Sequence, residues 1–71
     1  MRQWLKDMRE LKGLSQQNVA EIIGITRQYY QQIEAGERQQ KMDITLITKI
    51  SKAFDISVSQ IINNEVQDEK E

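Results

Sequence analysis

Apolar residues recur at helical spacing in five segments of the chain, so the sequence predicts an all-α fold of five helices with no strands. Turn and capping residues separate these segments, and connections of about two to eight residues are normal for a helical domain. We expect helices from about Arg2 to Lys12, two within residues 14–36, one after Asp43 as far as Phe54, and one from Val58 to Ile62 or Asn63.

Within each helix, the apolar positions that share one side should face a common core. Trp4 is more simply explained as a core anchor than as an exposed functional aromatic. Residues 1–64 should form this domain, whereas residues 65–71 contain one apolar residue and predict an acidic, disordered tail. The expected core positions are Trp4, Leu5, Met8, Leu11, Val19, Ala20, Ile22, Ile23, Tyr30, Ile33, Ile44, Ile47, Ile50, Ala53 and Phe54.

The stretch from Leu14 to Gly36 contains two of these helices, and Gly24 lies between them. Ser15 and Thr26 are good N-caps, because their hydroxyls can accept a hydrogen bond from a free amide of the first turn. Glycine can adopt the left-handed conformation that ends a helix without a steric penalty. Two short helices joined in this way predict a helix-turn-helix.

The second helix of this pair has an outward face of one arginine and three glutamines: Arg27, Gln28, Gln31 and Gln32. The four side chains cover an arc of about 140° at roughly 100° per residue. Their planar groups can make paired hydrogen bonds to base edges in the major groove of DNA. A plain helical hairpin with a solvated face has the same periodicity, so the pattern alone leaves both interpretations open.

Charge is unevenly distributed along this chain, whose net charge is −1. Residues 1–62 contain nine basic and seven acidic side chains, and residues 63–71 contain one basic and four acidic side chains. No acid lies between Ile22 and Ile33. Because salt screens charges more than about 8–10 Å apart, the local field at the polar helix matters more than the net charge.

The composition argues against several classes of function. With no Cys and no His in 71 residues, the chain lacks disulfides, thiolate metal sites and the commonest general base. We therefore expect no enzyme activity, no cofactor and no metal site. Apolar runs of two or three residues predict no membrane span, and the lack of Cys agrees with a reduced cytoplasmic setting.

The pattern G-L-S-Q-x-x-V-A-x-x-I-G-I-T-R-x-x-Y-x-x-I-E-x-G, from Gly13 to Gly36, resembles the Xre/Cro family of phage-repressor-type DNA-binding domains. The similarity continues to Ile62. It implies a compact five-helix lambda-repressor-like domain. It also implies a sequence-specific regulator of transcription, most simply a repressor, that binds double-stranded DNA through its third helix.

The resemblance further implies a partly buried ion pair between Arg9 and Glu34, for which two independent surface charges are the alternative. It implies phosphate contacts from Gln16 and from Arg38 and Lys41 in the loop of residues 37–42, where solvated side chains are the alternative. This loop lacks proline and is expected to be mobile.

We assign base contacts to Arg27, Gln28 and Gln32, because the first turn of a recognition helix and its continuation on the same face enter the major groove most deeply. Arginine matches guanine and glutamine matches adenine. The residues expected at the DNA backbone or groove edge are Gln16, Gln17, Thr26, Tyr29, Gln31, Arg38 and Lys41.

The last predicted helix is very short for its apolar content, which leaves at least one apolar side chain exposed for a partner. Val58 is the foremost predicted dimer contact, because Ile61 and Ile62 are better placed for the core, and Ile62 is the second predicted contact. A two-fold dimer would bind a palindromic operator. The alternative is an antitoxin-like or accessory module that uses the same scaffold to bind a protein, and a protein regulator is compatible with either function.

Overall fold

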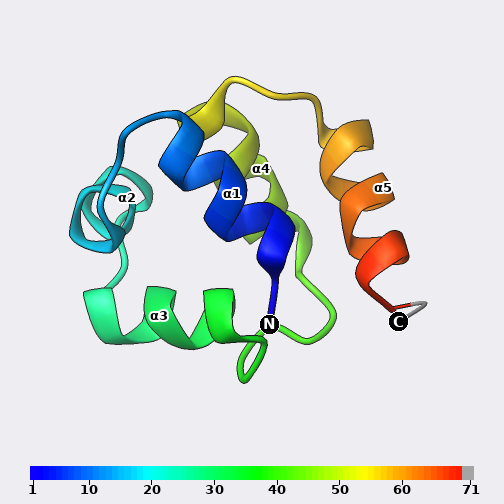
Figure 1. The fold of residues 1–71 in the computed structure, drawn as a ribbon, viewed down its shortest axis with the longest axis horizontal. Helices are drawn as coiled ribbons and strands as arrows, with labels where there is room; N and C mark the ends of the chain where they lie inside the picture. Colours follow the sequence, from blue (N-terminus) through cyan, green and yellow to red (C-terminus); the bar gives the residue numbers. More distant parts are fainter. Residues whose placement is uncertain (70–71) are drawn as a thin grey trace.

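Five α-helices and no strand make up residues 1–69, the part of the chain that the computed structural model describes (Figure 1). The helices are α1 (Gln3–Leu11), α2 (Gln16–Ile23), α3 (Arg27–Ala35), α4 (Ile44–Phe54) and α5 (Val58–Glu69). The predicted all-α, five-helix fold is therefore confirmed. No helix within this part of the chain combines the length and the apolar composition needed to span a membrane.

Local hydrogen bonds explain where α2, α3 and α4 begin. The side chains of Ser15, Thr26 and Asp43 each accept a hydrogen bond from the backbone amide three residues further along. At Ser15 the arrangement is reciprocal, since the Asn18 side chain also accepts from the Ser15 amide at 3.2 Å. These contacts satisfy amides that have no partner within the helix.

Left-handed residues end three of the helices that form the core, and Gly36 ends α3 with φ = 82°. Gly24 ends α2 with φ = 77°, as predicted, and turns the chain into α3. Asp55 ends α4 with φ = 56°. An L-residue other than glycine is disfavoured in this conformation, although aspartate tolerates it better than most.

The core lies where all five helices meet, and each contributes at least one fully buried side chain. Tyr30 and Phe54 are the largest of these. Within the described residues, α2 contacts both α3 and α4, α4 contacts α5, and α1 contacts α3. The buried apolar residues are Leu5, Val19, Ala20, Ile23, Tyr30, Ile33, Leu46, Ile50, Phe54 and Ile61.

Three of the predicted core positions are wrong, because Leu11, Ile22 and Ile44 are exposed. Leu11 is the last residue of α1, where the helix has passed its neighbours. On α4 the prediction was right for Ile50 and Phe54, which are buried, but wrong for the first position. Leu46 is buried instead, and Ile44 lies about 160° away from it at roughly 100° per residue.

The end of α5 also differs from the prediction. The helix does not stop at Ile62 or Asn63 but continues to Glu69, so residues 65–69 of the predicted tail are helical. Glu65 lies one turn after the buried Ile61 and accepts hydrogen bonds from Arg2 and Trp4, which explains why the helix continues. Residues 70 and 71 of the predicted tail lie outside the described residues.

Candidate nucleic-acid interface

The outward face of α3 carries the polar residues that the sequence places there. Arg27, Gln28 and Gln31 are exposed, and Gln32 is half-buried. Gln28, Gln31 and Gln32 line one side of an open depression of about 580 Å³, and Glu37 lies at its edge. The face therefore presents amide groups to solvent, with an acid at the C-terminal end of the helix.

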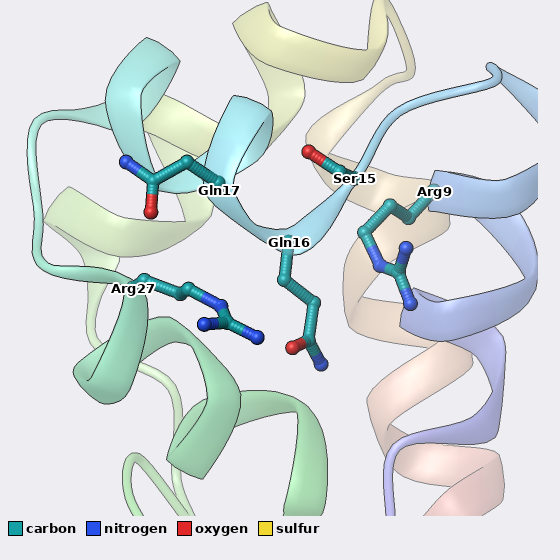
Figure 2. A pocket seen from close by; sticks show the side chains of 5 residues that line it. All are labelled: Arg9, Ser15, Gln16, Gln17 and Arg27. Atoms are coloured by element: carbon teal, nitrogen blue, oxygen red, sulfur yellow. The ribbon is translucent and has the colours of Figure 1, made fainter.

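A second depression, of about 490 Å³, lies where the N-terminal ends of α2 and α3 approach α1. Its lining residues are Arg9, Ser15, Gln16, Gln17 and Arg27, and Figure 2 shows the Gln16 amide between the guanidinium groups of Arg9 and Arg27. No acid lines this depression. The charge of Arg9 is balanced by Glu34, so the exposed Arg27, together with the free amides at the start of α2, favours binding of an anion such as a phosphate group.

The predicted ion pair is present in the structure and supports this depression from behind. Arg9 Nε donates to Glu34 Oε2 at 2.9 Å and Arg9 Nη2 donates to Glu34 Oε1 at 3.1 Å. The side chains are 11 % and 3 % exposed, so the pair is largely withdrawn from water. Arg9 also donates to the Leu14 carbonyl at 2.9 Å, which ties α1 to the start of the helix-turn-helix.

Gln16 takes part in this network as well as lining the depression. Its side-chain amide donates to Glu34 Oε1 at 3.3 Å. Burial alone raises the pKa of Glu34, but the hydrogen bond from Arg9, the adjacent Tyr30 hydroxyl and the hydrogen bond from Gln16 outweigh it and hold that pKa below its ordinary value. The hydrogen bond from Arg9 to Glu34 likewise raises the pKa of Arg9. Both groups are charged at neutral pH.

The Tyr30 hydroxyl is buried beside this pair and has no hydrogen-bond partner among the described residues. Burial of the hydroxyl, together with the neighbouring Glu34 carboxylate, raises the pKa of Tyr30. The phenol is therefore protonated, and it adds no negative charge behind the arginines.

The loop that follows α3 is held by more contacts than the sequence suggested. Gln39 has a positive φ of 54°, and its side chain donates to the Tyr29 hydroxyl at 2.8 Å and to Asp43 at 3.1 Å. The Tyr29 hydroxyl is thus engaged within the protein. Arg38 and Lys41 are exposed. Lys41 lines a groove beside α5 and not the depressions at α3.

The two predicted dimer contacts lie on one side of α5. Val58 is 41 % exposed and Ile62 is 47 % exposed, while Ile61 is fully buried. Val66 extends this apolar stripe by one more turn and is also exposed. The sequence analysis missed Val66, because it ended the helix too early.

Arg2, Glu65 and Gln39 are the structurally engaged polar residues that the sequence analysis did not single out. Only Glu65 could have been recognised, since it follows the inward-facing Ile61 by four residues, the spacing of one helical face. Arg2 donates to three backbone carbonyls as well as to Glu65, and Gln39 donates to the side chains of Tyr29 and Asp43. Contacts of this kind leave no pattern in the sequence.

The architecture and the site define a helix-turn-helix domain whose second helix presents a polar face beside a cationic depression. A family model described as "Helix-turn-helix" matches residues 5–63, which is most of the chain. The chain belongs to the Xre/Cro-like helix-turn-helix family.

Two relatives from Bacillus subtilis (strain 168) carry the same kind of description. The chain is 38 % identical over 58 residues to the SPbeta prophage-derived uncharacterized HTH-type transcriptional regulator YonR, covering 82 % of this chain and 52 % of YonR. It is 38 % identical over 61 residues to the uncharacterized HTH-type transcriptional regulator YqaE, covering 86 % of this chain and 51 % of YqaE. The chain thus spans about half the length of the curated relatives it matches.

Proposed function

We propose that this chain is a sequence-specific regulator of transcription that binds double-stranded DNA with α3 in the major groove. The observation that carries the proposal is the exposed Arg/Gln face of α3, directly beside a depression that Arg27 and Gln16 line and that has no acid among its described lining residues. Membership of the helix-turn-helix family and the names of the two relatives as transcriptional regulators support DNA binding over a protein-interaction module.

In this proposal, Arg27, Gln28 and Gln32 contact the bases. Arg27 and Gln28 belong to the first turn of α3, the end that reaches base edges in helix-turn-helix proteins. Gln32 follows Gln28 by one turn and shares the same depression with it. Arginine suits guanine and glutamine suits adenine, and each good bidentate pair contributes about 1–3 kcal/mol of discrimination.

The remaining polar residues hold the DNA backbone or the edge of the groove. Gln16 and Gln17 lie at the start of α2, so a phosphate seated there would also face the free amides of that helix. Such contacts fix the register of the protein on the duplex without reading sequence. The residues assigned to this role are Gln16, Gln17, Thr26, Tyr29, Gln31, Arg38 and Lys41.

The protein binds as a two-fold dimer through Val58 and Ile62, and it represses by covering the DNA that it occupies. Both side chains are exposed on one side of α5, and a symmetric pair of α3 helices requires a palindromic site. Half-sites read in successive turns of the major groove lie about 34–36 Å apart.

Selection from a randomised pool of duplex DNA with the purified chain tests this function. We expect enrichment of one palindrome whose half-sites are separated by about one helical turn. Binding should weaken steeply with salt, as for any protein that displaces counterions from phosphates. No enrichment over several rounds at low salt would contradict DNA recognition.

A further inference from the structure

Arg2 is a buried arginine at the junction of three segments. The whole residue is 5 % exposed, and the start of α1 lies beside the end of α3 and the loop that follows it (Figure 1). Arg2 Nη1 donates to the Ile33 carbonyl at 2.7 Å and to the Arg38 carbonyl at 3.1 Å. Arg2 Nη2 donates to the Gln39 carbonyl. The guanidinium therefore joins the last turn of α3 to the α3–α4 loop, residues 37–42.

Glu65 of α5 supplies the charge partner for this arginine. Arg2 Nε donates to both Glu65 carboxylate oxygens at 2.9 Å, and Arg2 Nη2 lies 2.9 Å from Glu65 Oε1. The same carboxylate accepts from Trp4 Nε1 at 2.7 Å. A guanidinium is stable away from water only when it is paired and hydrogen-bonded, so Glu65 fixes where Arg2 can lie.

The α3–α4 loop depends on these contacts because its own backbone conformation is unfavourable. Gln39 has a positive φ, which costs free energy for any residue with a Cβ atom. The carbonyls of Arg38 and Gln39 turn inward to Arg2, and the exposed Arg38 side chain belongs to the same two-residue segment. Arg38 is the loop residue assigned to a DNA phosphate in the proposed function.

We propose that Arg2, held by Glu65, is a positioning residue for the α3–α4 loop, so that α5 determines where Arg38 is presented to DNA. The loop is coupled to α5 through one guanidinium. The DNA part of this inference rests on the proposed function, whereas the coupling itself can be measured on the free protein.

The first measurement is amide hydrogen exchange of the free 71-residue chain carrying Glu65→Gln. The amides of Arg38 and Asp43 report on the loop, since they donate to the Gln32 carbonyl and the Gln39 side chain. We expect both to exchange about tenfold faster, because a hydrogen bond to a charged group contributes at least that factor. The core amides of α2 should be accelerated less than these two, because they respond only to the change in global stability.

Glu21→Gln is the matched control. Glu21 is exposed on α2 and makes no side-chain hydrogen bond among the described residues, and its substitution changes the net charge by the same amount. Loop amides that exchange equally in the two variants overturn the coupling. Exchange raised uniformly over the whole chain also overturns it, because that result shows a general loss of stability. If Glu65→Gln does not fold, Glu65→Asp, which keeps the charge but shortens the reach, takes its place.

The second measurement is DNA affinity across a salt titration on the selected operator. Removing one acid should strengthen binding slightly in Glu21→Gln, because the protein becomes more positive. The same charge change in Glu65→Gln should weaken binding, and the salt slope should fall by about 0.9 if Arg38 loses its phosphate. Equal, small gains in both variants contradict the role of α5 in DNA binding.

The coupling of the loop to α5 and the contact of Arg38 with DNA can be disproved independently of each other. Wild-type protein that binds no DNA refutes the proposed function, while the exchange data still decide whether Arg2 and Glu65 hold the loop. Arg38→Ala provides the reference for the salt slope. If this variant keeps the wild-type slope, Arg38 contacts no phosphate and its presentation by α5 is excluded.

Discussion

Gln28 and Arg38 differ in what each can add to DNA binding. Gln28 is exposed on the face of α3 and carries an amide that can pair with adenine. Gln28→Ala should therefore relax base preference at one position in each half-site, at a cost of about 1–3 kcal/mol for the preferred base. Binding to single-base variants of the selected operator measures this effect.

Arg38→Ala is the control for that measurement. It should weaken every site nearly equally and lower the salt slope by about one unit, because a phosphate contact carries no sequence information. If Gln28→Ala keeps all base preferences of the wild-type protein, α3 does not read DNA in the orientation assigned here.

The Arg9–Glu34 pair gives a second prediction for single residues. Both charges are almost excluded from water, so Glu34→Gln leaves a buried guanidinium without its partner. We expect a loss of about 3–5 kcal/mol in the free energy of unfolding, a large share of the roughly 5–15 kcal/mol of a small domain. Urea denaturation at neutral pH measures this loss. If Glu34→Gln and Arg9→Met each leave the free energy of unfolding nearly unchanged, the pair contributes little to folding.

Among the helices, the end of α4 offers a gain in stability. Asp55 has φ = 56°, is exposed and makes no side-chain hydrogen bond among the described residues. Glycine adopts this conformation without the strain that a Cβ atom causes. Relief of left-handed strain is worth about 1–2 kcal/mol, and the greater freedom of glycine in the unfolded chain offsets about 0.4–1 kcal/mol of it, so Asp55→Gly should raise the free energy of unfolding by roughly 0.5–1 kcal/mol.

Gly24→Ala is the converse change at the end of α2. No atom lies within 4 Å of the new Cβ, so only its positive φ of 77° opposes the substitution. It should lower stability by about 1–2 kcal/mol. Thermal unfolding of both variants compares the two helix ends, and a destabilised Asp55→Gly protein would contradict the argument from strain.

Local signals predicted where α2, α3 and α4 begin and where α2 ends. The caps at Ser15, Thr26 and Asp43 and the left-handed Gly24 depend on residues that are neighbours in sequence, so the sequence contains the whole interaction. The Arg9–Glu34 pair spans 25 residues, and only its place in a family pattern made it predictable.

The remaining features depend on contacts between helices. Periodicity placed Ile44 in the core, but the packing partner of α4 selects the side that carries Leu46. The end of α5 depends on Arg2 and Trp4, which lie more than 60 residues earlier in the chain. The DNA contacts assigned to α3 and the loop remain predictions, since they concern a partner and not the fold of the chain.

For the whole molecule, the lowered pKa of Glu34 predicts how stability depends on pH. Its ordinary value is 4.5, and the hydrogen bond from Arg9, the adjacent Tyr30 hydroxyl and the hydrogen bond from Gln16 keep the folded-state pKa below that value. The unfolded chain therefore binds this proton first as the pH falls. The contribution of Glu34 is fully present above the unfolded pKa and is lost as the pH falls through the folded pKa.

The difference between wild-type and Glu34→Gln protein isolates this effect, because both contain every other acid. We expect the difference in the free energy of unfolding to be constant above about pH 5 and to narrow at lower pH. Urea denaturation at several pH values measures it. The raised pKa of Arg9 affects stability only in strongly alkaline solution, outside this range. A difference that does not narrow in acid would contradict ionisation of Glu34 in the folded protein.

The exposed apolar side of α5 predicts how the protein assembles on DNA. The stripe of Val58, Ile62 and Val66 on α5 borders a groove of about 190 Å³ that Met42 and Ile47 also line. A symmetric partner would bury this stripe against its own copy, so each substitution there changes both halves of the interface.

Burying a large aliphatic side chain contributes about 1.5–3 kcal/mol, so Ile62→Asn should weaken binding to the palindrome at least about tenfold. Affinity for an isolated half-site should not change. Ile44→Asn is the matched control, because Ile44 is also exposed but lies on α4. Mobility shifts and sedimentation with full-site and half-site duplexes measure both affinity and stoichiometry. One protein bound to the full palindrome, or equal losses on both duplexes, would rule out a dimer formed through α5.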